Sequence, residues 1–385
     1  MSGAPDLRAA VAIAGAALSD MGSVPVGTTP AGLMAQASRR ALAQCGLAPA
    51  DVDGVFAAST QLPWASVTLA EELGIAPRYG DSTQVGGSSP IAHLNHARAA
   101  ITAGLCDVAL IAYGSTQRLV GRAVASVQEI DRYEAPHRPM LPLAAYALAA
   151  SRHMHEFGTT PEQLAEVAVS ARRWAQAWDG TPAAWATKDL TVEDVLAAPR
   201  LCDPLGVKDC CLVTDGGAAV VVVSRERARD LLGTSACEVL VLGVGETQAH
   251  RHVSSMPDLV RTTAVDSGAA AFAEARLGPQ DVQVAQLYDA FTITPIVFLE
   301  DLGFCAKGEG GPFVQSGAIA PGGSLPVNTT GGGLSFQHPG MNGLPLLVEG
   351  VRQIREVGRD VSLVHANGGV WSSQCTVVLG SGAAA

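Results

Sequence analysis

The 385-residue chain contains little charge, few aromatic residues and very few lysines. Charged residues make up 16% and aromatic residues 5%, against 48% apolar residues, so the chain can bury a large core and is not intrinsically disordered. Its net charge of −11 excludes a basic surface that follows nucleic-acid phosphates. Lysine occurs only at Lys188, Lys208 and Lys307, which leaves few candidates for Schiff-base chemistry.

Long apolar runs and targeting signals are also absent. The longest strongly apolar stretch, Ala218–Val223, is much shorter than the roughly 18–20 residues that cross a membrane, and it predicts a buried strand. The weakly apolar segment Ala9–Leu18 follows Asp6 and has no basic region before it, so we expect no secretory signal and a cytoplasmic protein. Eight cysteines without a CxxC spacing predict neither a disulfide framework nor a zinc site.

One stretch of the sequence occurs twice. Leu47–Val55 (LAPADVDGV) returns as Leu277–Ala285 (LGPQDVQVA). Each copy follows an Ala-rich helical segment and precedes a short apolar strand, Gly54–Ala58 or Val284–Tyr288. Two matched units favour a duplicated α/β half over a solenoid, which needs more and shorter repeats. Chance recurrence of a Leu-x-Pro-x-Asp-Val turn is the alternative, because proline is common where helices begin.

The remaining pattern alternates strands with helices, which predicts open mixed sheets with helices on their faces. The stretch from about 115 to 209 is polar, with little strand character, and predicts an insertion over the sheet. We therefore expect an N-terminal half at 1–230, including this inserted loop domain, and a C-terminal half at 231–385. The other strands expected are Ala10–Ala16, Asp107–Tyr113, Val239–Gly243, Val361–Val364 and Thr376–Leu379, and the other helices are Ser88–Ala103, Phe291–Leu302 and a segment after Pro339.

Several motifs that mark common chemistries are missing. There is no GxxxxGK[ST], no HExxH and no GxSxG, and Gly243–Gly245 lacks the third glycine of a dinucleotide fingerprint. Four segments with polar side chains remain, three of which are rich in glycine. They are Gln84–Pro90 (QVGGSSP), Leu287–Thr292 (LYDAFT), Asn328–Gly343 (NTTGGGLSFQHPGMNG) and His365–Val370 (HANGGV).

In this combination the chain resembles the thiolase superfamily, specifically sterol-carrier-protein-type thiolases and the thiolase-like aldolases that shorten steroid side chains. Further matching segments are Asp209–Gly217 (DCCLVTDGG) and Leu299–Glu309 (LEDLGFCAKGE). The resemblance implies a duplicated thiolase fold: α/β, with two mixed-sheet halves in an αβαβα layered arrangement and an inserted loop domain. It also implies pairing into a homodimer.

The nucleophilic cysteine of thiolases has no counterpart. In that family it begins the helix after the third strand, and the matching residue is Gly87. Cys106 lies at the far end of the same predicted helix, which at about 18 residues is roughly 27 Å long. The second family cysteine is also missing, because that turn reads Ala366–Gly368 (ANG). We therefore expect no covalent acyl-enzyme; Ser88 would need a general base beside it.

The groups that polarise a thioester are retained. The resemblance implies that His338 of the HPG block helps to form an oxyanion hole; a capping or core histidine is the alternative. Asn367 and the glycine amides after it offer a second set of hydrogen-bond donors, and each such donor stabilises the transition state by about 2.7–4 kcal/mol. A left-handed turn at Asn367 is the alternative. His365 follows an apolar strand, which makes a core residue as plausible as a catalytic one. Expected contacts to CoA are Gly332, Gly368, Gly369 and Ser88.

Tyr288 distinguishes the chain from ordinary thiolases. The resemblance to the aldolases implies that this tyrosine of the Tyr-Asp-x-Phe block is the catalytic acid–base group, and a phenol can exchange a proton with an alkoxide when its neighbours tune it. A buried tyrosine with a satisfied hydroxyl is the alternative. The second tyrosine of that family is absent from Ser335–His338, which points to another substrate or to His338 in its place.

The leading hypothesis is a retro-aldolase that cleaves a β-hydroxyacyl-CoA, carrying a steroid or other bulky side chain, to a ketone or aldehyde and a shortened acyl-CoA. CoA would be part of the substrate, no cofactor or metal would be bound, and a small zinc-ribbon/OB-fold protein would be the partner. One alternative is a thiolase or acyltransferase that uses Ser88 or free CoA as nucleophile. Another is a non-catalytic subunit that binds acyl-CoA or lipid.

Two further groups of residues are conspicuous in the sequence. Lys307 and Glu309 are expected to form a solvated or loop-anchoring pair. The tryptophans Trp174, Trp178 and Trp185, with Arg172 and Arg173, line either a CoA entrance or an ordinary packing interface, because arginine suits nucleotide phosphates.

Overall fold

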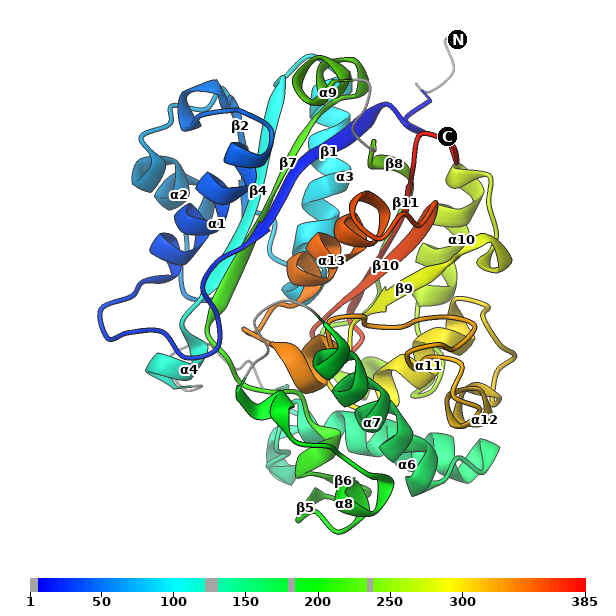
Figure 1. Cartoon of the computed structure of the whole chain (residues 1–385). Coiled ribbons are helices and arrows are strands. Elements are labelled where there is room, and N and C mark those ends of the chain that lie inside the picture. Colours follow the sequence, from blue (N-terminus) through cyan, green and yellow to red (C-terminus); the bar gives the residue numbers. More distant parts are fainter. Residues whose placement is uncertain (1–5, 122–130, 179–183, 234–237) are drawn as a thin grey trace.

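The computed structural model describes residues 6–121, 131–178, 184–233 and 238–385. Nine strands form one mixed sheet in the order β3-β2-β4-β7-β1-β8-β11-β10-β9 (Figure 1). The strands are β1 (Val11–Leu18), β2 (Gly54–Ala57), β3 (Tyr79–Asp81), β4 (Val108–Ser115), β7 (Gly216–Ser224), β8 (Leu240–Gln248), β9 (Val284–Leu287), β10 (Val361–Gly368) and β11 (Ser373–Gly380). Each predicted strand is present, and most extend one to five residues beyond the predicted ends because the sheet continues where the apolar pattern stops.

The two halves of this sheet repeat one topology. In the first half, β2 and β4 are parallel, and β7 lies antiparallel between β4 and β1. In the second half, β9 and β10 are parallel, and β11 lies antiparallel between β10 and β8. Val327 makes an isolated parallel bridge to Ala285 at the place that corresponds to β3. The halves join where Ala12 of β1 pairs with Leu240 of β8.

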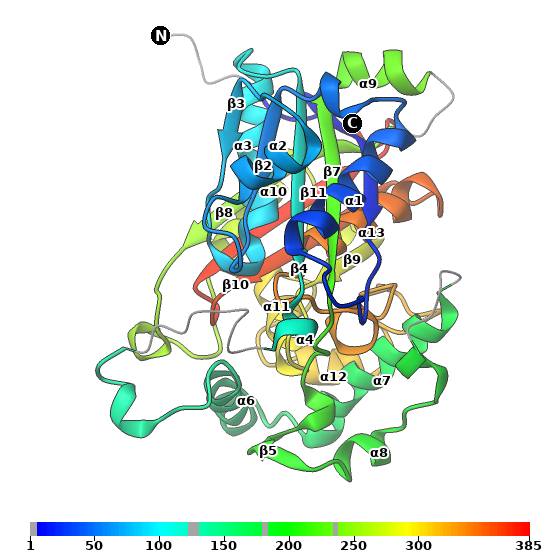
Figure 2. The ribbon, with the colours of Figure 1, turned by 90° about the vertical axis from the view of Figure 1, so that its left-hand side faces the viewer.

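Helices cover both faces and fill the space between the halves (Figures 1 and 2). Helices α3 and α13 contact each other and strands of both halves, α1 and α2 cover the first half, and α10 packs on β8 and β11. The result is the expected α/β fold, with a layer of helices between the two mixed-sheet halves. The domain limits at 230/231 stay a prediction. These helices are α1 (Pro30–Gln44), α2 (Ala65–Leu73), α3 (Ser89–Thr102), α10 (Ala264–Ala275) and α13 (Gly343–Arg355).

The repeated sequence forms the same local structure in both copies. Pro49–Asp51 and Pro279–Asp281 are single 3₁₀ turns, in which the Asp carboxylate accepts a hydrogen bond from the residue before the proline, at 2.8 Å in each copy. Glycine permits close contact between helix and strand in each half. A Cβ atom on Gly15 would lie 2.0 Å from the carbonyl oxygen of Ala41, and a Cβ on Gly243 would lie 2.1 Å from that of Ala271.

The predicted insertion forms helices below the sheet in both views (Figures 1 and 2). It contains α4 (Gln117–Val120), α6 (Leu143–Phe157), α7 (Pro161–Ala177), α8 (Val192–Leu196) and the short hairpin β5 (Arg200–Cys202) and β6 (Leu205–Gly206). Of these helices, α6 and α7 pack on α11 (Ile293–Asp301), and α7 also packs on α12 (Gly310–Gln315). In the described part of the chain, no helix is long and apolar enough to span a membrane.

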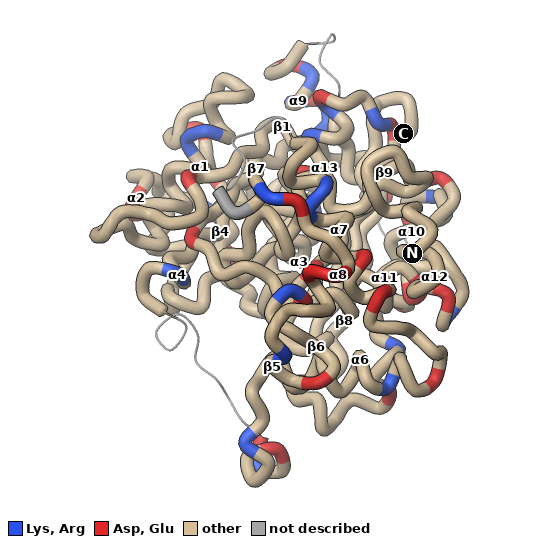
Figure 3. The backbone as a smooth tube through the Cα atoms, turned by 60° about the horizontal axis from the view of Figure 1, so that its bottom comes forward, with Lys and Arg blue, Asp and Glu red and all other residues tan. Residues whose placement is uncertain are grey.

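Charged residues are sparse along the backbone (Figure 3), yet one charged cluster is buried between the insertion and α11. The Nζ atom of Lys307 lies 3.0 Å from Glu300 and 2.7 Å from Asp301, and both carboxylate side chains are fully buried. His153 of α6 lies 3.0 Å from the same Glu300. Lys307 does anchor a loop, but its partners are these two residues and not Glu309, because α11 presents its last two carboxylates to the loop that follows.

We expect Lys307→Met to destabilise the protein. The substitution keeps the aliphatic stem but removes the cation that faces two buried carboxylates, and breaking such a buried pair costs about 3–5 kcal/mol. Urea unfolding of the variant measures the loss in the free energy of unfolding. Lys208→Met, at an exposed position, is the matched control and should lie within about 0.5 kcal/mol of the parent. Equal effects for the two variants would show that the cluster contributes nothing.

Candidate active site

The segments 84–90, 287–292, 328–343 and 365–370 are far apart in the sequence. They meet at one place between the two halves of the sheet. A Cβ atom on Gly86 would lie 2.8 Å from the Cα of Gly368, so the first and last segments touch backbone to backbone. The backbone N–H of Tyr288 donates to the carbonyl oxygen of His365 at 3.0 Å, which joins the second segment to the last. A Cβ on Gly343, at the start of α13, would lie 2.3 Å from the carbonyl oxygen of Gly87.

Tyr288 and Gly87 share one small volume. A Cβ atom on Gly87 would lie 2.5 Å from Cε2 and 2.6 Å from the hydroxyl oxygen of Tyr288, and 2.5 Å from the carbonyl oxygen of Asn367. Each distance is far below van der Waals contact, so no side chain fits at position 87 while the phenol stays in place. The phenol therefore occupies the space that a cysteine at position 87 would require.

The hydroxyl group of Tyr288 has two long hydrogen bonds. It donates to the carbonyl oxygen of Gly340 at 3.2 Å and accepts from the backbone N–H of Asn342 at 3.3 Å. Burial raises the pKa of Tyr288 well above its usual value near 10. The resting residue is therefore a neutral phenol, which can donate a proton and accept one at the same oxygen.

His338 faces this phenol as a neutral imidazole. Its ring lies edge-on to that of Tyr288, with 5.5 Å between the ring centroids. Burial lowers the pKa of His338 to about 4. None of the described residues hydrogen-bonds its Nε2 atom, although that atom is buried. Nε2 is therefore available to a substrate, as a donor or as an acceptor according to the tautomer.

Asp289 is a buried carboxylate to which the sequence alone assigned no function. It accepts hydrogen bonds from the backbone N–H groups of Gly333 at 2.7 Å and Leu334 at 3.1 Å, at the start of the π-helix Gly332–Phe336. Burial raises the pKa of Asp289 to about 7. A Cβ on Gly332, where φ is +56°, would lie 2.3 Å from this carboxylate. The structure thus places Gly332 under Asp289; its predicted contact with CoA stays a prediction.

His365 and Asn367, on β10, have their polar atoms engaged by neighbours. The two ring nitrogens of His365 lie 2.8 Å from the hydroxyl of Thr376 and 3.0 Å from the amide oxygen of Gln374, and burial lowers the pKa of His365 to about 3. The amide nitrogen of Asn367 donates to the hydroxyl of Tyr146 at 2.8 Å. Asn367 lies in a strand and not in the left-handed turn that the sequence also allowed.

Three of the five tyrosines converge here, two of which were not predicted from the sequence. Tyr146 comes from α6 of the insertion and also donates to the carbonyl oxygen of Gly369 at 3.1 Å. Tyr113, on β4, donates to the carbonyl oxygen of Pro339 at 2.6 Å. No sequence pattern predicts this convergence, because α6 and β4 are distant from the site segments along the chain.

Ser88 is buried beside the glycine turns without a base. Its hydroxyl lies 2.9 Å from the carbonyl oxygen of Val85 and 2.8 Å from the hydroxyl of Ser373, and neither of these partners is an imidazole or a carboxylate. Cys106 lies beyond the far end of α3, where burial raises the pKa of its thiol to about 11. Neither residue has the surroundings of an activated nucleophile.

A cleft of about 760 Å³ borders the glycine turns, and the residues lining it include Gly86, Gly368, Gly369, His250 and Arg251. Three of its glycines belong to the segments that meet at the site, which makes the cleft the candidate entrance to it. This arrangement places the candidate CoA contacts Gly368 and Gly369 at an accessible surface.

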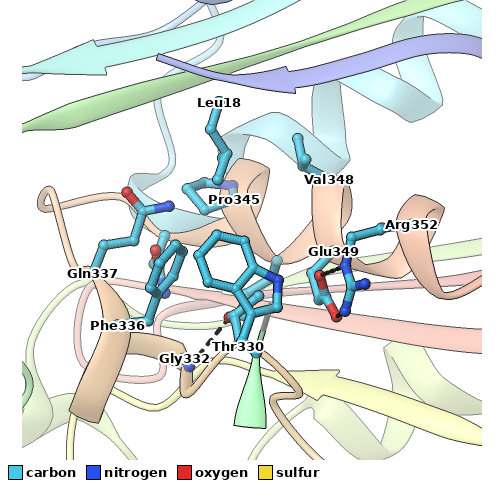
Figure 4. A pocket seen from close by; sticks show the side chains of 12 residues that line it. Leu18, Thr330, Gly332, Phe336, Gln337, Pro345, Val348, Glu349 and Arg352 are labelled. Atoms are coloured by element: carbon cyan, nitrogen blue, oxygen red, sulfur yellow. Dashed lines mark hydrogen bonds and ion pairs between the residues drawn. The ribbon is translucent and has the colours of Figure 1, made fainter. Parts of the chain in front are cut away.

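A smaller cavity of about 50 Å³ lies between Gln337, Trp178 and the start of α13, where Pro345 and Glu349 line it (Figure 4). Gln337, Asn342 and Trp178 each line it with a buried polar atom that none of the described residues hydrogen-bonds. Two other members of the tryptophan and arginine group contact the C-terminal half: Arg172 donates to the hydroxyl of Ser335 at 3.2 Å, and Trp174 donates to the carbonyl oxygen of Ile319 at 2.8 Å. Arg173 is exposed. The side chain of Trp185 lies outside the described residues.

Comparisons with known proteins agree with this fold. Residues 245–381 match the model for the family "Thiolase C-terminal domain-like". The chain is 36% identical over 341 residues to a 17-hydroxy-3-oxo-4-pregnene-20-carboxyl-CoA lyase of Mycobacterium tuberculosis, covering 84% of this chain and 86% of that protein. It is 32% identical to a steroid side-chain-cleaving aldolase of Thermomonospora curvata, covering 97% and 99%. Among solved structures, the "Ltp2-ChsH2(DUF35) aldolase" superposes with a TM-score of 0.85 at 30% identity, covering 98% and 99%. The chain therefore belongs to the thiolase superfamily, in its branch of thiolase-like steroid side-chain aldolases.

Proposed function

We propose that the protein is a retro-aldolase that cleaves the bond between the α- and β-carbons of a β-hydroxyacyl-CoA. The products are a ketone or aldehyde and a shortened acyl-CoA. The observation that carries this proposal is the phenol of Tyr288 in the space beside Gly87 that a cysteine would require. Relatives named as a lyase and as a side-chain-cleaving aldolase support it and favour a steroid or another bulky acyl group.

The pKa of Tyr288 shapes the proposed step. A buried phenolate is costly, so the oxygen accepts the proton of the substrate's β-hydroxyl as its own proton leaves. The bond between the α- and β-carbons breaks, its electron pair forms the thioester enolate, and the β-carbon becomes a carbonyl. The proton released by Tyr288 goes to the α-carbon of that enolate, so the phenol is regenerated and no phenolate accumulates.

The enolate oxygen carries the developing negative charge and needs donors already in place. We assign this function to Nε2–H of His338, whose buried nitrogen has no partner among the described residues, and to the backbone amides of Gly368 and Gly369. CoA would approach through the 760 Å³ cleft, whose lining residues include Arg251. Asn367 and His365 would support the turn from behind and would not contact the substrate.

The alternative enzymatic function, acyl transfer without a cysteine, finds less support in the site. The hydroxyl of Ser88 is engaged by Val85 and Ser373, neither of which offers a base. A non-catalytic acyl-CoA-binding subunit would not need a neutral histidine and a buried phenol facing each other at 5.5 Å.

The proposal includes two partners. A neighbouring solved structure names a second component, ChsH2(DUF35), in its title. We propose that this protein also acts with an accessory protein, of the small zinc-ribbon/OB-fold kind, and that it pairs with a second copy of itself.

Tyr288→Phe should abolish most of the cleavage activity. The substitution keeps the ring, and therefore the packing against His338 and Gly87, but removes the oxygen that exchanges the proton. General acid–base groups contribute about 10²–10⁴-fold, so kcat should fall by this factor while KM changes little. The release of ketone or aldehyde from a β-hydroxyacyl-CoA measures it. Activity within twofold of the parent would refute the assignment of Tyr288.

Gly87→Ala should inactivate the enzyme although it removes no polar group. Its methyl group would lie about 2.5 Å from the ring of Tyr288 and must displace it, so we expect a fall of at least about 10²-fold in kcat/KM. Gly80→Ala is the matched control, because a Cβ there makes only an ordinary contact at 3.6 Å. The idea of a shared volume fails if the Gly87 variant, shown to be folded, retains the activity of the Gly80 variant.

The imidazole of His338 should stay neutral between pH 5 and 8. An exposed histidine titrates near 6.5, but burial makes the imidazolium unfavourable here and moves the pKa to about 4. Its NMR signal in histidine-labelled protein, assigned with His338→Gln, should therefore shift only below about pH 5. A titration midpoint near 6.5 would show that the ring is solvated and not held in the site.

A further inference from the structure

A continuous chain of hydrogen bonds runs behind the candidate site. It begins at His365, whose Nε2 lies 3.0 Å from the amide oxygen of Gln374. The amide nitrogen of Gln374 donates to Asn367 at 3.1 Å, and that of Asn367 donates to the hydroxyl of Tyr146 at 2.8 Å. The Tyr146 hydroxyl donates to the carbonyl oxygen of Gly369 at 3.1 Å. Four bonds thus connect the middle of β10 to its glycine turn.

Every bond in this chain has one direction. The Tyr146 hydroxyl has a single hydrogen, and because it accepts from Asn367, that hydrogen is left for Gly369. At the other end, Gln374 uses its nitrogen toward Asn367, so its oxygen must accept from His365. The hydrogen of neutral His365 is then on Nε2, and Nδ1 accepts from the hydroxyl of Thr376 at 2.8 Å. Reversing one group would leave a buried polar atom without a partner.

Tyr146 is held at both ends of its side chain. Its ring lies 4.6 Å from that of Phe291 and 5.2 Å, edge-on, from that of Trp371, measured between centroids. Its hydroxyl is fixed by Asn367 and Gly369. Among the described members of the inserted domain, it is therefore the side chain that ties α6 to the turn beside the catalytic phenol.

Gly368 is held by its pairing with Ser373 of β11 and by a hydrogen bond from the backbone N–H of Ser372 at 3.0 Å, so the freedom of the turn lies at Gly369. Gly368 and Gly369 follow each other, and Gly369 has φ +64°, a conformation that glycine reaches and leaves easily. A donor group aids a reaction only when it is already oriented toward the developing charge. The hydrogen bond from Tyr146 fixes the Gly369 carbonyl and with it the orientation of the turn.

We propose that Tyr146 is a positioning residue of the cleavage reaction, which holds the Gly368–Gly369 turn in its donor orientation at the end of the chain from His365 through Gln374 and Asn367. This inference rests on the proposed function of the site and adds a residue from the inserted domain to it. Tyr146 acts through the turn, so its removal affects the transition state more than the binding of CoA.

Tyr146→Phe and Gln374→Leu test this proposal singly and together. Each should lower kcat at least about tenfold, with KM within about twofold of the parent. Gln374 reaches Tyr146 only through Asn367, so the double variant should be no slower than the slower single variant. Tyr133→Phe, the same substitution at an exposed tyrosine, is the control and should keep the parent's kcat. If Gln374→Leu does not fold, Gln374→Glu replaces it, because a carboxylate cannot donate to Asn367.

The outcomes distinguish a failure of the positioning proposal for Tyr146 from a failure of the proposed function. A folded Tyr146→Phe protein with kcat within twofold of the parent, or losses that multiply in the double variant, would overturn the positioning function. If the parent itself cleaves no β-hydroxyacyl-CoA, the proposed function fails. Thermal unfolding of the same variants then tests whether the hydrogen bonds from His365 to Gly369 act together. Non-additive shifts of the unfolding midpoint would then support the chain of hydrogen bonds, and additive shifts would overturn it.

Discussion

The rest of the site depends on the contact between the phenol of Tyr288 and the bare backbone of Gly87. A Cβ atom on Gly87 would lie only 2.5 Å from the ring and equally close to the carbonyl oxygen of Asn367, so a side chain at position 87 needs both the phenol and this backbone to move. A thiol at the helix start and a phenol from the end of β9 are therefore alternatives in this fold. With the phenol present, the chemistry that we propose is proton transfer beside a polarised thioester instead of covalent acyl transfer.

The fold explains why such a contact can be made. Each half of the sheet ends in a glycine-rich turn, and α3 and α13 begin between the halves, so four backbone segments approach each other without side chains between them. The buried environment then sets the protonation states. Desolvation keeps Tyr288 protonated and His338 neutral, which gives the site a donor and a group free to hydrogen-bond, without any net charge on these two.

The sequence predicted eight of the nine strands of the large sheet and the missing cysteine, but neither the edge strand β3 nor how the polar groups pair. Ala218–Val223 was recognisable as buried because both faces are apolar, and β7 is indeed Gly216–Ser224. Gly87 and Tyr288 were found through motifs, whereas their shared volume depends on three-dimensional packing. Tyr146 could not be found, because its contact with Asn367 joins residues 221 positions apart and its helix shows no polar pattern. Asp289 lay inside a recognised motif, yet its partners are backbone N–H groups of a π-helix that no side-chain pattern announces.

The most direct test is a single turnover of a β-hydroxyacyl-CoA by excess enzyme in the absence of free CoA, followed by intact-protein mass spectrometry. We predict that the carbonyl product and the shortened acyl-CoA form at full rate and in equal amounts, and that the protein mass never changes. A requirement for added CoA, or a mass increase equal to an acyl group, would contradict proton transfer by Tyr288 as the basis of the reaction.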